Sequence, residues 1–366
     1  MDNTKSNAER EMMRFAALNP VVVTNIVEPT EVQLRGRDYV GWGDDNAYPD
    51  YLLDLYRNVP TLRTIINGSV DYAAGDEVTA AGDWERAMNK RGDSARDLVR
   101  LLARDWYTYG GFALQVIRDA LGGVAELYHT DIRYLRANKE GDVFYYSEHW
   151  GAKNLRSDRV LVYPAFMEGA DHPNSILYIK DARTQVYPAP LYAASVKACE
   201  IERSIDEYHL NEINNGFAPS VMINFNNGRP TDDIKDEIER SVQEKFAGKN
   251  NAGRIMLSWN DGVATRTTID QFSVQDYGAK YESLAKHSRQ QIFTAFRANP
   301  NLFGIPTESL GFSEEEYQQA FKLYNRTQVQ PVQRMIVDAF DRVLGVKNSI
   351  TIVPFSLEGA GEDAIK

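Results

Sequence analysis

The sequence contains few of the residues that carry covalent chemistry. Its 366 residues include one cysteine, Cys199, and five histidines. A single cysteine excludes an intramolecular disulfide and a cysteine metal cluster, and a reducing cytoplasm is the simplest setting for synthesis. The chain has no His-Glu-x-x-His motif and no Gly-x-Ser-x-Gly motif. We therefore expect no catalytic residues, no metal site and no cofactor, and a protein that is not an enzyme.

Long hydrophobic runs are also absent. No segment approaches 18 consecutive apolar residues, so we expect no membrane-spanning helix and no membrane partner. The first 15 residues lack the apolar stretch of a secretory signal. Hydrophobic residues still make up 43% of the chain and aromatic residues 11%, which is enough for a packed core.

Positively charged residues are fewer than negatively charged ones, with 41 Lys and Arg against 52 Asp and Glu. The formal net charge is −11 and the calculated pI is about 5.1. Tight nucleic-acid binding depends on lysine and arginine neutralising phosphates, so the balance disfavours a sequence-specific binder, as does the lack of a basic recognition helix. It does not exclude a protein past which DNA slides.

Three local features could suggest a site, and each has a simpler interpretation. His129-Thr130-Asp131 lies at a predicted strand end, where a histidine is more often a surface or packing residue. Cys199 lies on the apolar face of a predicted helix, as a buried inert thiol would. "GKNNAGRI", residues 248–255, has the glycine spacing of a phosphate-binding loop but carries Arg254 in place of lysine. It also connects a helix to a strand, which is the reverse of the required order.

The pattern of apolar and turn residues predicts an α+β fold. Residues 36–185 combine three helical segments with short strands and read as one domain. A long helix is predicted from Pro190 to Asn215, with an outward side that is mainly acidic. A small β-α-β module follows, with strands at 219–225 and 253–259 and a helix beginning after Thr231.

The last third is predicted to be mainly helical. A second long helix begins near Asp276 and has a basic polar side. A loop rich in apolar and amide residues separates it from a helix that begins at Ser313-Glu314-Glu315-Glu316, which matches a capping box. Pro331 predicts a kink or break in that last helix. A strand at "NSITIVPFS" and an acidic tail complete the chain.

Four motifs, in this order, resemble those of the portal proteins of tailed bacteriophages. They are "NEINNGFAPSVMINF", "GKNNAGRIMLSW", "QQIFTAFRANPNLFGIPTESLGFS" and "TQVQPVQRMI". The first is similar to the family's helix, Asn-Gly, proline and strand; the second to its Asn-Ala-Gly and apolar strand. The third resembles its Phe-Gly-Ile-Pro loop and the fourth its Thr-x-x-x-Pro turn. The resemblance is strongest from Pro188 to Leu344, and upstream "GDDNAYP" resembles portal N-terminal regions more weakly.

The resemblance implies the portal fold, with an α/β wing, a two-helix stem, a clip, a tunnel loop and a kinked long helix. It divides the chain into an N-terminal arm (1–35), a wing (36–185), a first stem helix (186–216), a clip (217–270), a second stem helix (271–297), a tunnel loop (298–313), a tunnel helix (314–345) and a C-terminal strand and tail (346–366). Because so few residues follow the tunnel helix, the family's helical crown is expected to be missing or vestigial.

The resemblance also implies a function. A ring of about twelve copies, a dodecamer, would occupy one capsid vertex of the virion. It would be the channel for packaging and ejecting double-stranded DNA without reading its sequence. The implied partners are further copies of the chain, DNA, the terminase large subunit, a head-tail adaptor, and the major capsid and scaffold proteins, with assembly in the host cytoplasm.

Three groups of residues would serve these roles. The tunnel loop would place in the channel Asn299, Pro300, Asn301, Leu302, Phe303, Thr307, Glu308, Ser309, Leu310 and Phe312. The second stem helix would face DNA with Lys280, Lys286, Arg289 and Arg297. The clip would contact terminase, adaptor and neighbouring copies through Phe225, Asn226, Asn227, Arg229, Lys249, Asn250, Arg254 and Trp259.

Each assignment has an alternative. Phe303 and Ile305 could pack the loop onto its helices, and so, with less weight, could Leu302. Lys286 could pair with Glu282 one helical turn earlier. For the whole chain, the alternative is an acidic hydrolase with a dispersed Asp and Glu site, which would be a monomer or dimer with a deep pocket.

Overall fold

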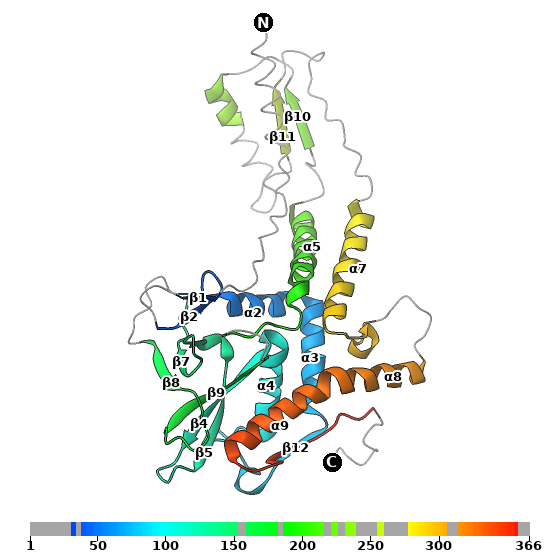
Figure 1. The fold of residues 1–366 in the computed structure, drawn as a ribbon. Helices are drawn as coiled ribbons and strands as arrows, with labels where there is room; N and C mark the ends of the chain where they lie inside the picture. Colours follow the sequence, from blue (N-terminus) through cyan, green and yellow to red (C-terminus); the bar gives the residue numbers. More distant parts are fainter. Residues whose placement is uncertain are drawn as a thin grey trace. The chain divides into compact units, whose positions relative to one another are not determined.

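The structure is a computed structural model, and it describes residues 31–33, 38–151, 159–181, 186–215, 221–225, 231–238, 255–259, 277–305 and 313–357 (Figure 1). The chain divides into two compact units. The larger unit joins Met1–Glu200 to Arg289–Lys366, and the smaller unit is Ile201–Ser288. The N-terminal arm predicted for residues 1–35 lies outside the described residues up to position 30. Because the larger unit includes Arg289–Lys366, the predicted wing (36–185) shares one compact unit with the C-terminal part of the chain.

Helices form the centre of the larger unit. They are α2 (Tyr48–Asn58), α3 (Pro60–Ala74), α4 (Ala95–Tyr109) and α9 (Gln330–Leu344). Pro60 begins α3 at a position where a missing N–H costs nothing. Ser94 and Asp97 form a capping box at the start of α4, and Gly110 closes it with φ 85°. Contacts of α4 and α3 with α9 bring together segments more than 200 residues apart (Figure 1).

The larger unit also contains two three-stranded antiparallel sheets, of which the first packs against α4 and α9. The first has the order β5-β4-β9 and consists of β4 (Gly111–Arg118), β5 (Val124–Thr130) and β9 (Asn174–Lys180). The second has the order β6-β7-β8 and consists of β6 (Leu135–Ala137), β7 (Val143–Tyr146) and β8 (Leu161–Pro164). Asn138 Oδ1 accepts hydrogen bonds from the backbone N–H groups of Gly141 and Asp142 in the predicted hairpin turn.

Two short pairs complete the described strands of the larger unit. β1 (Glu31–Gln33) pairs antiparallel with β2 (Val40–Trp42). The predicted C-terminal strand is present as β12 (Ile350–Val353), and it pairs antiparallel with β3 (Glu77–Ala80). The C-terminal segment is thus fastened to the beginning of the unit. Buried apolar residues from α2, α3, α4, β4 and α9 form one continuous core.

The predicted start of the first long helix is wrong by about one and a half turns. A 3-10 turn, η4 (Ala193–Ser195), precedes α5 (Val196–Asn215). Tyr192 is fully buried, and its hydroxyl donates to the carbonyl of Thr108 over 2.9 Å. A Cβ on Gly110 would lie 2.1 Å from the carbonyl oxygen of Ala189. This close packing holds the chain before η4 against the core and delays the helix.

The smaller unit contains the end of α5 and the start of α7 (Tyr277–Ala295). The rings of Tyr208 and Tyr281 lie 4.8 Å apart between the two helices. The predicted β-α-β module is described in part: β10 (Val221–Phe225) pairs parallel with β11 (Ile255–Trp259), and residues 232–238 between them are helical. Parallel pairing requires such a crossover.

Pro331 does interrupt the last helix as predicted, and it does so through a change of helix type. α8 (Glu314–Tyr324) passes into a π-helical segment, η7 (Asn325–Val329), before α9. The proline ring excludes the α-helical contact with the carbonyl four residues earlier. The wider π turn accommodates that clash without ending the helix. Among the described residues, no helix is both long and apolar enough to cross a bilayer.

Candidate functional site

The turn after α7 begins the predicted tunnel loop. Arg297 follows the helix with φ 51°, and its N–H donates to the carbonyl of Thr294. The next turn is η6 (Pro300–Phe303), which Asn299 caps by accepting from the N–H of Asn301 over 3.0 Å. Gly304 closes η6 with φ 72°. The first third of the predicted loop is therefore regular structure with its own caps.

Leu302 fastens this turn to α3. Its side chain is 5% exposed and belongs to the core. Its carbonyl accepts a hydrogen bond of 2.7 Å from the Tyr72 hydroxyl. Burial raises the pKa of that hydroxyl strongly, so it remains a protonated donor. Leu302 is thus held both by the packing of its side chain and by the hydrogen bond to its carbonyl.

Phe303 occupies a notch in α3. A Cβ on Gly68 would lie 2.6 Å from Cδ1 of the Phe303 ring, so only glycine leaves room for the ring at this distance. The ring also lies 6.0 Å from that of Tyr72, 6.2 Å from that of Phe293 and 5.6 Å from that of Tyr324. Aromatic pairs at these separations add to the stability gained from burial.

The structure supports the packing interpretation for Leu302, Phe303 and Ile305. Leu302 is in the core, and the other two pack against it. Both residues hold the turn in place, and the assignment of their side chains to a channel stays a prediction. Asn299, Pro300 and Asn301 are half-buried. Thr307, Glu308, Ser309, Leu310 and Phe312 lie outside the described residues.

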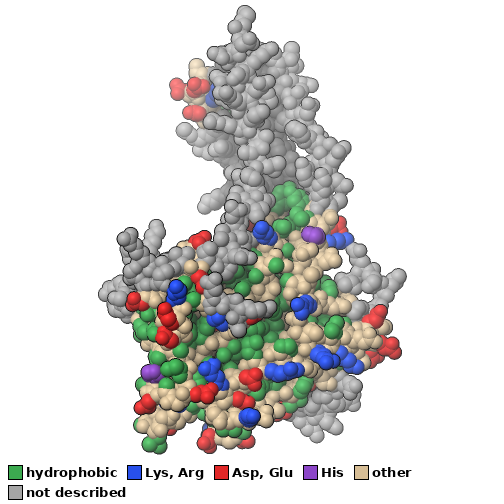
Figure 2. All heavy atoms as spheres, viewed as in Figure 1, with side chains coloured by type: hydrophobic (Ala, Val, Ile, Leu, Met, Phe, Trp, Pro, Cys, Tyr) green, Lys and Arg blue, Asp and Glu red, His purple; other side chains and the backbone are tan. Residues whose placement is uncertain are grey.

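The far end of the loop is also fixed. Ser313 and Glu316 form the predicted capping box: Ser313 Oγ accepts from the N–H of Glu316, and the Glu316 carboxylate accepts from the N–H of Ser313. Exposed Glu314, Glu315 and Glu316 gather at this end of α8 (Figure 2). Negative charge at a helix N-terminus is favoured by the helix dipole.

The π segment is held by two hydroxyl groups. Tyr324, at the end of α8, shares a hydrogen bond of 2.6 Å with Ser69 of α3. Tyr107 of α4 donates to the carbonyl of Gln328 over 3.2 Å. The widened turn leaves carbonyls outside the normal helical pattern, and these contacts satisfy one of them. α3 therefore anchors both η6 and the end of α8.

The predicted basic residues of the second stem helix differ in their surroundings. Lys286 forms an ion pair of 3.5 Å with Glu282, which is the alternative considered from the sequence. Arg289 and Arg297 are exposed. Lys280 lies in α7, but its side chain is outside the described part. Lys286 is thus engaged by a carboxylate of its own helix, whereas Arg289 and Arg297 are exposed.

The predicted clip residues are placed only in part. Phe225 and Trp259 are register partners at the ends of β10 and β11. Asn226, Asn227, Arg229, Lys249, Asn250 and Arg254 lie outside the described residues. Their role in docking stays a prediction.

The anchoring residues on α3 were not identified from the sequence. Gly68, Ser69 and Tyr72 lie within one of the helical segments predicted in residues 36–185, and the sequence pattern assigns no role to the three. A glycine inside a helical pattern indicates a close approach by another group. That signal was present at Gly68, but it does not name Phe303 as the approaching residue.

A polar network that is buried only around His129 and Asp105 lies elsewhere in the larger unit. His129 Nε2 is 2.8 Å from Asp105 Oδ2, and Arg133 pairs with Asp50 at 3.1 Å and lies 3.6 Å from Asp131. Burial, with help from the Asp105 carboxylate, raises the pKa of Asp131 to about 6. Burial opposes charge on His129, but Asp105 outweighs it and raises the pKa of His129. The network ties α4, the end of β5 and α2 together.

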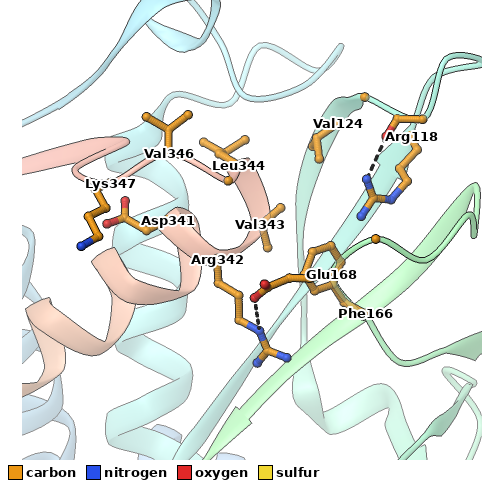
Figure 3. A pocket seen from close by; sticks show the side chains of 14 residues that line it. Arg118, Val124, Phe166, Glu168, Asp341, Arg342, Val343, Leu344, Val346 and Lys347 are labelled. Carbon is orange, nitrogen blue, oxygen red and sulfur yellow. Dashed lines mark hydrogen bonds and ion pairs between the residues drawn. The ribbon is translucent and has the colours of Figure 1, made fainter.

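A cleft of about 610 Å³ lies beside the end of α9 (Figure 3). Phe166 is one of its lining residues, and the guanidinium groups of Arg118 and Arg342 lie 5.4 and 6.0 Å from its ring centroid. Arg342 pairs with Glu168 at 3.5 Å, and Arg118 donates to the carbonyl of Gly122 over 2.8 Å. These local partners engage both arginines. In the described residues, no group of three or more His, Cys, Asp or Glu side chains could hold a metal ion.

Comparison with known families decides the relationship. The family model described as "Phage portal protein" matches residues 85–360, which is more than half of the chain. The chain belongs to the phage portal protein family. That family is structural. The match includes β4, β5 and β9, α5, α7 and the η6 to α9 region, so the portal relationship predicted from four motifs is confirmed across both compact units.

Solved structures of similar fold come from gene transfer agent particles. One chain, from the virion of a native gene transfer agent particle, is 19% identical with a TM-score of 0.54, and the match covers 84% of each chain. Another, from the neck of a native gene transfer agent particle computed with C12 symmetry, is 17% identical with a TM-score of 0.54 and 86% coverage of each. A third, from the neck of an empty particle computed with C6 symmetry, is 17% identical at 0.54, covering 93% of this chain and 89% of the other. No curated protein matches.

Proposed function

We propose that this portal protein assembles as a ring at one capsid vertex and forms the channel through which DNA enters and leaves the particle. The observation that carries the proposal is the family match over residues 85–360. Two of the structural relatives come from particle necks, which is the position such a ring would occupy. Within the virion, the ring would be the connector between head and tail.

The ring would contain about twelve copies. This number is supported by the relative whose neck was computed with C12 symmetry. A closed ring of identical subunits needs head-to-tail contacts in which each copy presents two different surfaces. The small β10–β11 module supports such contacts, because a two-stranded sheet is too small to be stable without neighbours.

The elements would divide as the family resemblance implies. Residues 36–185 would form most of the wing, α5 and α7 the stem, 217–270 the clip, and residues 298–313 the tunnel loop ahead of α8 and α9. The clip would dock the terminase large subunit during packaging and a head-tail adaptor afterwards. The wing would face the major capsid and scaffold proteins during assembly in the host cytoplasm.

The loop would touch DNA beyond its anchor. Because Leu302 and Phe303 pack against their own chain, most of the channel contact would fall to the segment from Thr307 to Phe312 and to the half-buried amides of Asn299 and Asn301 before it. Apolar and amide groups make weak contacts that do not depend on base sequence. A duplex could then slide past this segment, because the segment has no lysine or arginine to hold phosphates.

Light scattering and negative-stain imaging of the purified protein test the proposal. A ring has a mass near twelve times 41.4 kDa and an annular image with a central channel. A monomer or dimer at every concentration, with no annular particles, would contradict it and favour the hydrolase alternative.

A further inference from the structure

Arg297 has a backbone conformation that favours glycine. Its φ is 51°, which L-residues rarely adopt because Cβ approaches the neighbouring carbonyl. The N–H of Arg297 donates to the carbonyl of Thr294, and that of Ala298 donates to the carbonyl of Phe293, each over 3.0 Å. This pair of bonds is the Schellman motif, whose left-handed residue is usually glycine.

Three other helices in the described residues follow the rule. Glycine occupies the left-handed position after α4, η6 and α9, at Gly110, Gly304 and Gly345. Arg297 thus keeps a charged side chain at a conformational cost that glycine would avoid. Strain retained in this way indicates a use for the side chain.

The surroundings of Arg297 in the sequence indicate the partner. From Ser283 to Thr307 the chain has no aspartate or glutamate, although it holds 52 of them in 366 residues. The same segment contains Lys286, Arg289 and Arg297, and both arginines are exposed. In a chain of net charge −11, a long acid-free segment with exposed arginines fits a polyanion better than a protein surface.

We propose that Arg297 is a phosphate-contacting residue of the channel, and that it holds the duplex at the point where α7 meets the tunnel loop. The inference rests on the proposed portal function. A guanidinium matches the geometry of a phosphate better than an ammonium does. Each copy contributes one such group, so a ring presents a belt of them at a single level, next to the rigid η6 anchor.

The test compares R297G, R297K and N348G rings with wild type. Asn348 also has positive φ, 54°, and is exposed, so N348G relieves the same kind of strain without removing charge. The probe is a fluorescently labelled DNA duplex of about 30 base pairs, and its anisotropy is measured at several salt concentrations. Light scattering confirms that all four rings have equal mass.

We expect R297G to melt at a higher temperature than wild type yet bind the duplex several-fold more weakly. Its slope of log affinity against log salt should fall by about one or more, since each lost phosphate contact contributes about 0.9. N348G should also melt higher but bind as wild type does, and R297K should keep most of the affinity.

Equal affinity and salt slope for R297G and wild type would overturn the inference, and the proposed function would stand. A lower melting temperature for R297G would also overturn it, because the side chain would then be holding the fold together. A wild-type ring that binds no duplex would instead contradict the channel function and this inference with it.

Discussion

Single residues fix the start of the predicted tunnel loop. Gly68 and Tyr72 of α3 lie more than 200 residues before Leu302 and Phe303, and their contacts hold Leu302 in the core and Phe303 against it. Because Gly68 has no side chain, the Phe303 ring can approach α3 closely. Packing of this kind tolerates little change in volume.

Gly68→Ala should therefore destabilise the protein despite the better helix propensity of alanine. The added methyl would lie 2.6 Å from the Phe303 ring, and overpacking of this kind costs about 1–3 kcal/mol. Denaturant unfolding measures the loss. G151A is the matched control, since a Cβ there meets open space, and it should change stability by less than about 0.5 kcal/mol.

A double-mutant cycle checks the cause. In the F303A background, G68A should cost much less than it does in the wild type, because the clashing ring is gone. Equal costs in both backgrounds would show that position 68 acts through something other than Phe303.

Asp131→Asn should change how stability depends on pH. The folded pKa of Asp131, about 6, is above the unfolded value of about 3.9. The folded state thus binds the proton more tightly, and the stability it contributes is full below about pH 4 and lost as pH rises to about 6. The free energy of unfolding of D131N relative to wild type should rise across that window and then level off.

Urea unfolding of both proteins from pH 4 to pH 7 measures this difference. Asparagine can still accept the hydrogen bond from the N–H of Arg133, so the local turn is kept. A difference between the two proteins that does not vary with pH would mean that Asp131 has an ordinary pKa in the folded state.

Among the elements, the segment from α8 to α9 shows how one proline shapes a long helix. Pro331 sits in the first turn of α9, directly after the π segment, and the helical path continues through both. The π turn is tied to α3 and α4 by Tyr324 and Tyr107. The capping box at Ser313 fixes the other end of α8. Both ends of the predicted tunnel loop are therefore held, by η6 at one end and by the capping box at the other.

Ser313→Ala should destabilise the N-terminal end of α8. Losing the N-cap oxygen leaves the N–H of Glu316 without its acceptor and costs about 1 kcal/mol. Hydrogen exchange of the first-turn amides of α8 should quicken, while that of α9 stays unchanged. Ser313→Asp is the control, because its carboxylate can cap the same group. Equally fast exchange in S313D and S313A would argue against a capping role.

At the scale of the whole molecule, the smaller unit is an insertion in the sequence of the larger one. The chain leaves the larger unit along α5 and returns to it along α7. Within the larger unit, the Ser195 hydroxyl donates to the carbonyl of Gln291 over 3.0 Å. The exit and the return thus lie side by side, and the buried residues around Cys199 and Ile292 belong to the core of the larger unit. The larger unit should then fold without the smaller one.

Joining Glu200 to Arg289 by a Gly-Ser linker of about four residues, a normal length between antiparallel helices, tests this. The shortened protein should unfold in one cooperative thermal transition monitored by circular dichroism. A chain with helical signal but no cooperative transition would show that the larger unit depends on residues 201–288.

The sequence by itself determined the order of the elements, because local signals specify them: apolar spacing, the Ser313 capping box and the Pro331 interruption all act over a few residues. It also pointed to the portal family, since its four motifs are local. Only the tertiary structure decided that α5 begins at Val196, because buried Tyr192 holds the chain before it. The fates of Leu302 and Phe303 were likewise set by Gly68 and Tyr72, more than 200 residues away. Hydrophobic character says that a side chain will be buried, but only the assembled core shows against what.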